Sequence, residues 1–354
     1  MEEFRINKNN GMEIGLYTLG DHVSDPITGK IMSEHSRMKQ MVAMAKLAED
    51  AGLDVYGVGE SHQKHFIASS TPTILAAIAS ETERIKLISS STVLSADDPV
   101  RVFEQFSTLD LLSDGRAEIV AGRGSRYGVY ELFGYDMEDF EELFEEKIDL
   151  LLKLNSEQQI TWNGKFRPVL NEAEIFPKPF SGKLPIWRAV GGKPVSAIKA
   201  GRIGMPMHLA ALYGASSVFK HTVDAYRRTA TEAGFDSAKL PVAMATMLYL
   251  HKDSQTALKE YYPYLNNTFT QLRGTPFPKD RYAEATSVKN AIMVGNPQQI
   301  IEKILYQYEL YEHQRFIVQI DHGNMPFKKI QELIEMFAIE VVPAIRKATK
   351  GKGN

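Results

Sequence analysis

Short apolar runs alternate along the chain with longer segments in which apolar residues recur at helical spacing. The apolar runs cover 13–18, 54–58, 85–89, 117–121, 185–190, 204–209, 241–250 and 316–320. This alternation is typical of repeated strand–helix units around a parallel sheet. Because about eight such strands are each followed by a helical segment, the pattern predicts an α/β fold, a (β/α)8 TIM barrel with insertions, over an open doubly wound sheet.

The helical segments have recognisable ends. Gly52 stops the first predicted helix, and Pro72 and Pro99 stand where proline is favoured, in a first turn. The predicted helices cover 33–51, 99–112, 139–154, 217–234, 252–272, 297–310 and 326–348, and two more begin near 70 and 193.

Two segments interrupt the alternation. Residues 159–179 are expected to form a hairpin and an irregular insertion, and residues 273–280, which contain Gly274, Pro276 and Pro278, are expected to form a loop. The chain is therefore expected to be one barrel domain over 1–354 with two rim insertions that shape the substrate pocket.

Composition narrows the function classes. The 354 residues are 44% hydrophobic and 24% charged, with a net charge of -3 and no cysteine. This balance excludes a strong positive field for nucleic acid, and the missing thiols exclude disulfides and cysteine nucleophiles. The N-terminus is polar and no run of about 18 apolar residues occurs, so we expect an intracellular protein that acts on small molecules, not at membranes.

The segment Ala121–Ser125, AGRGS, follows the fourth predicted strand. Loops after strand ends build the active site of a barrel, and glycines let backbone N–H groups approach a ligand. Gly122, Arg123, Gly124 and Ser125 are therefore candidate ligand contacts, with Arg123 on a phosphate. A tight turn with a surface arginine is the alternative.

The segment Val190–Ser196, VGGKPVS, follows a strand and opens a helix. Free N–H groups and the helix dipole favour an anion there, so Gly191, Gly192 and Ser196 are proposed contacts. An ordinary helix cap is the alternative. No Walker loop or GxGxxG follows a strand, which favours a mononucleotide such as FMN over a nucleoside triphosphate or dinucleotide.

Three titratable residues follow the second strand, at Glu60, His62 and His65. They suit acid–base chemistry, whereas a metal site is disfavoured because no ordered ligand set such as HExxH occurs. Glu60 is alternatively a buried structural carboxylate.

The segment Ser89–Pro99 offers small residues, which permit a ligand ring to lie near the backbone, and Asp97 or Asp98 as a helix N-cap. His208, Asp321 and His322 also stand near predicted strand ends, each as a weak signal.

These segments, in this order, resemble the bacterial luciferase-like flavin-dependent monooxygenases. The resemblance rests on PVRVFEQFSTLDLLSDGRAEIVAGRGS at 99–125, PIWRAVGGKPVSAIKAGRIGMP at 185–206, VGNPQQIIEKI near Val294 and FIVQIDHGNMP near Phe316. It implies a TIM barrel that holds reduced FMN at the strand C-termini, with the phosphate on Arg123 and on the Gly191–Ser196 stretch.

The resemblance also implies details of the site. A non-prolyl cis peptide under the flavin ring falls at Ser90 and Ser91, and Gly122 stands where the luciferase has a cysteine near that ring. The family's Glu-His-His reads Glu60, Ser61, His62 here. Serine thus occupies the position of the proposed general base, which puts luciferase-type aldehyde chemistry in doubt and leaves His62 as an acid or base.

The expected activity is that of a cytoplasmic oxidoreductase, a monooxygenase that takes reduced FMN from a separate reductase and oxygenates a small organic substrate with O2. A homodimer is expected because the family often dimerises through barrel helices. Two alternatives stay open: hydride transfer with a deazaflavin, and a flavin-binding barrel without turnover.

Overall fold

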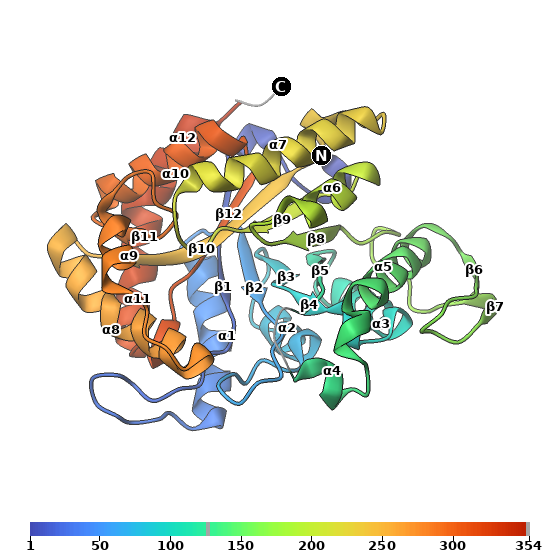
Figure 1. Cartoon of the computed structure of the whole chain (residues 1–354), viewed down its shortest axis with the longest axis horizontal. Coiled ribbons are helices and arrows are strands. Elements are labelled where there is room, and N and C mark those ends of the chain that lie inside the picture. Colours follow the sequence, from blue (N-terminus) through green and yellow to red (C-terminus); the bar gives the residue numbers. More distant parts are fainter. Residues whose placement is uncertain (125–127, 352–354) are drawn as a thin grey trace.

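Parallel strands form the centre of the molecule (Figure 1), and their pairing closes them into a ring. The computed structural model describes residues 1–124 and 128–351. Within them, eight strands close the ring in the order β12, β1, β2, β3, β5, β8, β9, β10 and back to β12, which confirms the predicted TIM barrel. The ring strands are β1 Glu13–Thr18, β2 Val55–Val58, β3 Lys86–Ser89, β5 Ala117–Gly122, β8 Ile186–Val190, β9 Met207–Ala210, β10 Val242–Leu250 and β12 Arg315–Gln319.

Side chains alternate between the barrel axis and the surrounding helices, as the strand period of two requires. On β1, Ile14 and Leu16 pack in the large outer core, whereas Tyr17 packs with Val120 and Ile317 around the axis. Strands buried on both faces explain why the sequence shows continuous apolar runs instead of strict alternation.

Helices cover the outside of the ring (Figure 1). The Asp98 carboxylate accepts from the Val100 N–H at the start of α3, as expected for an N-cap, and Asn296 and Gln299 form a capping box at α10. A π-helical turn at Phe337–Val341 divides the last predicted helix. The helices are α1 Glu34–Asp50, α2 Thr71–Ala79, α3 Pro99–Leu112, α4 Val129–Leu132, α5 Phe140–Ser156, α6 Pro194–Arg202, α7 Ser216–Glu232, α8 Ser254–Arg273, α9 Lys279–Ala283, α10 Pro297–Tyr311, α11 Phe327–Met336 and α12 Val342–Thr349.

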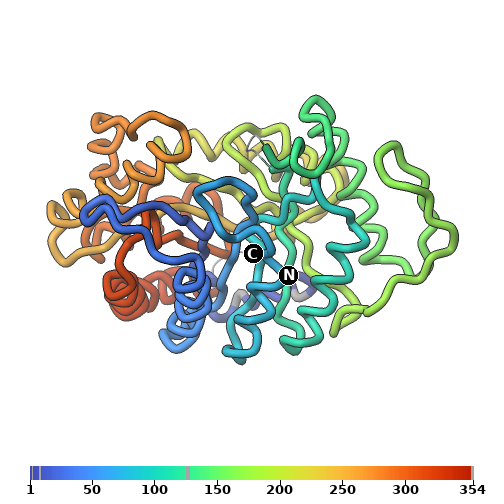
Figure 2. The backbone as a smooth tube through the Cα atoms, turned by 90° about the horizontal axis from the view of Figure 1, so that it is seen from below, coloured from blue at the N-terminus to red at the C-terminus, as the bar shows by residue number. Residues whose placement is uncertain are grey.

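The first insertion contains the expected hairpin, β6 Gln159–Trp162 with β7 Leu170–Glu174. It projects from one end of the molecule in both views (Figures 1 and 2). The Glu146 carboxylate on α5 accepts from the backbone N–H groups of Lys165, Phe166 and Arg167, which fixes the hairpin tip to that helix.

The second insertion is shorter than expected, because α8 continues to Arg273 and α9 begins at Lys279. Phe277 is buried between them and donates its N–H to Asn266. Two short strands also escaped prediction: β4 Thr92–Val93 pairs with β5, and β11 Met293–Gly295 pairs with the end of β10.

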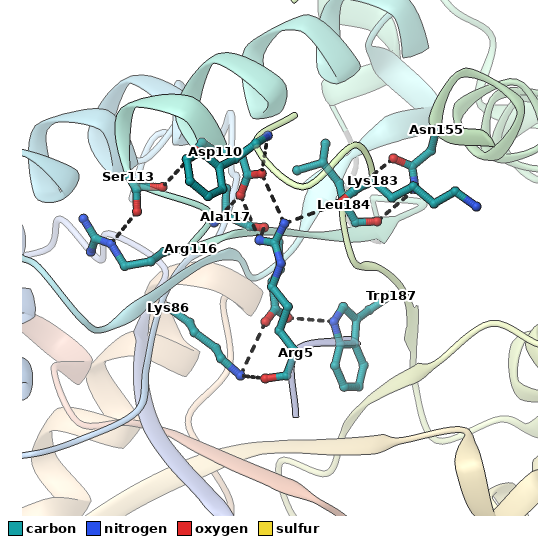
Figure 3. Close-up of polar contacts among 12 residues, drawn as sticks. Arg5, Lys86, Asp110, Ser113, Arg116, Ala117, Asn155, Lys183, Leu184 and Trp187 are labelled. Carbon is teal, nitrogen blue, oxygen red and sulfur yellow. Dashed lines mark hydrogen bonds and ion pairs between the residues drawn. The ribbon is translucent and has the colours of Figure 1, made fainter. Parts of the chain in front are cut away.

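The N-terminal segment packs against the N-terminal ends of the ring strands and forms the floor of the barrel, and Figure 3 shows the polar contacts of Arg5 there. The Arg5 guanidinium donates to both Asp110 carboxylate oxygens, at 2.8 and 3.1 Å, and to the Ala117 carbonyl, while Lys86 donates to the Arg5 carbonyl. Ile6 packs into the axial core. Since this end is closed, the open end of the barrel lies at the strand C-termini. None of the helices within 1–124 and 128–351 contains an apolar stretch that could span a lipid bilayer.

Candidate functional site

A cavity of about 510 Å³ lies at the C-terminal ends of the strands. It brings together side chains and backbone from segments that are far apart in the sequence. Eight of the predicted site residues line it, in the part of the chain that the structure describes: Glu60, His62, Ser90, Ser91, Gly122, Arg123, Gly124 and Gly191.

Glu60 and His62 form a hydrogen-bonded pair at one wall of the cavity. His62 Nε2 lies 2.7 Å from Glu60 Oε1, and both side chains are 11% exposed. The second carboxylate oxygen of Glu60 accepts from the Val93 N–H at 2.8 Å, and the His62 ring contacts Phe133 edge-on. The carboxylate therefore fixes both the imidazole and the backbone of β4. His65 is not among the lining residues.

The peptide bond between Ser90 and Ser91 is cis, which confirms the expectation from the resemblance. The Ser91 carbonyl accepts from the Glu60 N–H, so the Ser90–Ser91 backbone and the Glu60–His62 pair share one wall. Across from it, a Cβ on Gly122 would lie 2.4 Å from Ser91 Oγ. Gly122 is thus a position where these two strand ends approach too closely for a side chain.

Arg123 follows β5 at the mouth of the cavity and is held from two sides. Its Nη1 donates to Glu141 Oε1 at 3.0 Å, and its guanidinium lies 5.6 Å from the centre of the Phe140 ring. Its carbonyl accepts from the Tyr130 hydroxyl. With a third of its side chain exposed, Arg123 remains accessible to an anion that would compete with Glu141.

Of the second segment predicted to bind an anion, only one of the three proposed contact residues lines the cavity. Gly191 lines the cavity, and a Cβ there would meet no described atom within 4 Å. Gly192 and Ser196 are not among the lining residues: the Gly192 carbonyl accepts from Thr222, and the buried Ser196 hydroxyl accepts from Arg188 Nε at 3.0 Å. Their contact with a phosphate stays a prediction. Ser125 lies outside the described residues.

A buried arginine orders the helices beside this stretch. Arg188 makes a bidentate pair with Glu145 of α5, and Lys199 of α6 donates to the same carboxylate. Burial opposes the charge on Glu145, but Arg188 and Lys199 outweigh it and lower the pKa of that carboxyl. The network joins α5, which carries Glu141, to β8, the strand that precedes Gly191.

Three apolar residues of the cavity wall were not predicted from the sequence. Val129, Met137 and Phe140 come from the segment after Arg123, where α4 and the start of α5 fold over the mouth. They carry no motif, since their only signal is apolarity. The structure places no described residue of 159–179 or 273–280 in the lining.

Most of the remaining candidate residues make contacts that hold the fold together. Asp97 is partly buried, and that burial, with Glu60 nearby, raises the pKa of its carboxyl. Asp321 pairs with Arg37 in a buried ion pair, and the His322 ring lies edge-on to Tyr261. Across 1–124 and 128–351, no group of three or more histidines and carboxylates is arranged to hold a metal ion. His208 stands inside β9 instead of at its end, and it lines the floor of the cavity.

Comparisons with known proteins agree with this architecture. The chain is 24% identical to the F420-dependent glucose-6-phosphate dehydrogenase of Kribbella flavida, over 90% of this chain and 97% of that protein. It is also 24% identical to the alkanal monooxygenase alpha chain of Aliivibrio fischeri, over 72% and 78%.

Among solved structures, the oxygenating constituent of 3,6-diketocamphane monooxygenase from Pseudomonas putida, in complex with FMN, superposes with a TM-score of 0.77. It is 16% identical, and the match covers 94% of this chain and 98% of that one. The family model described as luciferase-like monooxygenase matches residues 12–313. This match covers most of the chain and agrees with the observed barrel. The protein therefore belongs to the luciferase-like monooxygenase family of oxidoreductases.

Proposed function

We propose that this protein is a flavin-dependent monooxygenase that binds reduced FMN at the mouth of its barrel and oxygenates a small organic substrate with O2. The observation that supports this most is the shared cavity. It joins Arg123, an anion-binding side chain at the mouth, to the Glu60–His62 pair on an inner wall.

The residues present fit FMN. A flat ring needs apolar walls and close backbone, and the cavity offers Val93 and Val120 with the glycines Gly122 and Gly191. Arg123 stands at the open side, where a phosphate can remain hydrated on one face. The volume of about 510 Å³ is in the range of small-molecule sites.

When bound, reduced FMN supplies the electrons and the reactivity toward O2. The protein's part is to bind, orient and exclude water. Arg123 fixes the phosphate end, and the Ser90–Ser91 and Gly122 backbone supports the ring. The apolar cover of Val129, Met137 and Phe140 limits the access of water.

Glu60 and His62 are assigned to proton transfer. His62 Nε2 bonds to the carboxylate, so its other ring nitrogen is the one that can exchange a proton with a ligand. Ser61, which stands in place of the luciferase histidine, is buried and donates its N–H to the Ala68 carbonyl. Substrates other than long-chain aldehydes are therefore favoured.

A second candidate is hydride transfer with the deazaflavin F420, without oxygen. It is favoured by the similarity to the F420-dependent dehydrogenase, which spans 90% of this chain. A flavin-binding barrel without turnover is the third.

The deciding experiment is a titration of the purified protein with FMN, riboflavin and F420, followed by oxygen uptake with a separate flavin reductase and NADH. Tight FMN binding, with substrate-dependent oxygen uptake over a panel of ketones, amines and thioethers, supports the monooxygenase. F420 binding with oxygen-independent reduction supports the second candidate, and binding without turnover supports the third. If none of the three cofactors binds, the proposal fails.

The proposed compartment is the cytoplasm, where flavin reductases are found. The proposed assembly is a homodimer, and light scattering on the purified protein tests it.

A further inference from the structure

His208 lies at the floor of the cavity with an unsatisfied side chain. It is the second residue of β9 and pairs in register with Ala189 of β8 and Ala243 of β10. The residue is 4% exposed, and among residues 1–124 and 128–351 neither ring nitrogen has a hydrogen-bond partner. Buried polar groups in proteins are almost always hydrogen-bonded, so this imidazole needs a partner that the described chain does not supply.

The neighbouring side chains leave His208 open toward the cavity. Ala189, Ala210 and Ala245 line the same cavity, and each has a single methyl group. Small side chains on β8, β9 and β10 therefore line the cavity that the imidazole also lines.

His313 provides an internal comparison. It is also fully buried with two unpartnered ring nitrogens in the described structure, and burial lowers the pKa of both histidines to about 3. However, His313 packs among Tyr308, Tyr311 and Phe316, and the nearest cavity holds about 20 Å³, roughly one water. An unpartnered histidine beside a cavity of about 510 Å³ is in a different situation, because a ligand can reach it.

The charge state of His208 limits the ligand chemistry. Burial and the Arg315 guanidinium on the barrel floor both disfavour its protonation, against a smaller opposing effect of Glu118. The neutral ring therefore presents one N–H donor and one lone pair at neutral pH. Such a ring can donate its N–H to a carbonyl oxygen, or bond to a hydroxyl group, without taking up a proton, whereas a carboxylate buried beside it would lose its hydration without gaining an ion pair.

We infer that His208 is a ligand-binding residue, which hydrogen-bonds to an uncharged carbonyl or hydroxyl oxygen of the molecule that fills the cavity. This rests on the proposed function, in which that molecule is the flavin ring or the organic substrate. Both the flavin and a substrate can present a carbonyl oxygen to the imidazole, so the experiment has one arm for the flavin and one for the substrate.

The variants are His208→Phe, which keeps the ring size and removes both nitrogens, and His208→Asn, which keeps a donor and an acceptor. His313→Phe is the matched control. If His208 binds the flavin, H208F weakens FMN binding about three- to tenfold, whereas H208N and H313F stay within about twofold of the wild type. Circular dichroism and thermal unfolding check that each variant is folded, and His208→Leu replaces H208F if the latter is not.

The second arm uses cyclohexanone and cyclohexane, which differ by one carbonyl oxygen, with binding followed by saturation-transfer NMR on the FMN-loaded protein. If His208 binds the substrate, H208F leaves FMN affinity unchanged but loses the preference for cyclohexanone, again by about three- to tenfold. H313F keeps that preference.

The inference is overturned if H208F matches the wild type in both arms. Failure of the proposed function is a separate result, because it appears as the absence of FMN binding to the wild type. In that case the cyclohexanone arm, run on the protein alone, still decides the role of His208.

Discussion

Nη1 of Arg123 lies 3.0 Å from Oε1 of Glu141. The guanidinium that is expected to bind a phosphate is therefore already paired with a carboxylate. The pair is partly exposed on both sides, at 34% and 47%, and exposed pairs of this kind are worth at most about 1 kcal/mol. A phosphate dianion can therefore displace Glu141, but it has to bind beside a like charge.

Glu141→Gln is expected to tighten FMN binding about two- to fivefold by removing that like charge, and Arg123→Gln is expected to weaken it about ten- to hundredfold. Riboflavin, which lacks the phosphate, should respond to neither change. Fluorescence titration measures both ligands. Glu142→Gln is the control, since Glu142 lies on the same helix but pairs with Lys165. Equal effects on FMN and riboflavin would show that Arg123 does not bind phosphate.

Removing the Glu60 side chain should affect stability as well as activity. Glu60→Ala leaves the Val93 N–H without its acceptor, and it also releases His62. The free energy of unfolding should fall by about 1–3 kcal/mol, measured by urea denaturation. The exposed Lys64→Ala serves as control and should change it by less than about 0.5 kcal/mol. If E60A unfolded with the same free energy as the wild type, Glu60 would have no structural role, and only its role in proton transfer would remain.

A methyl group at Gly122 should disturb the site. In Gly122→Ala the new Cβ would meet Ser91 Oγ at 2.4 Å, so Ser91 has to move. Stability should fall by about 1–3 kcal/mol, with a parallel loss of FMN affinity. Gly191→Ala is the matched change without a clash, because no described atom lies within 4 Å of its Cβ, and it should leave stability unchanged.

The double variant S91G/G122A tests that cause, because it removes the atom that the new methyl group meets. It should regain most of the stability lost in G122A, relative to S91G alone. If G122A were as destabilising on the S91G background, the clash would not be the reason.

Acid should destabilise the protein through its buried histidines. The pKa values of His208 and His313 are lowered from 6.5 to about 3, so between these values the unfolded chain binds protons that the folded chain does not. Stability is then highest above pH 6.5 and falls as the pH drops, by about 2.7 kcal/mol per pH unit for the two groups together.

His313→Phe should reduce that slope by about 1.4 kcal/mol per pH unit, measured from unfolding curves between pH 6 and 4. H208F should do the same, and the effects should add because the two sites are separate. An unchanged slope in H313F would mean that His313 keeps an ordinary pKa in the folded protein.

The barrel and much of the site could be predicted because local signals were strong. Continuous apolar runs marked the eight ring strands, and of the two residues expected to cap a helix, Asp97 or Asp98, it is Asp98 that caps α3. The cis bond at Ser90 followed from the resemblance, not from physical reasoning. The short strands β4 and β11 escaped because two or three residues give no periodicity.

The features that were missed depend on distant contacts. Arg5 and Asp110 are 105 residues apart, and nothing near either residue indicates the other. His208 had seemed to stand near a strand end, but pairing with Ala189 and Ala243 places it inside the barrel. Glu141 stands in the first turn of α5, where the helix dipole favours an acidic residue, and its contact with Arg123 depends on how α4 and α5 fold over the mouth.

The closed floor has a practical consequence for anyone who shortens this chain. The family match begins at Met12, so a protein trimmed to that region would lose Arg5 and Ile6. Trp187 and Arg315 on the floor would then be closer to water, and Arg315 is one of the charges that act on His208. The residues before the first strand thus act as a seal, and their deletion would alter the electrostatic environment of His208 from the end of the barrel opposite the cavity mouth.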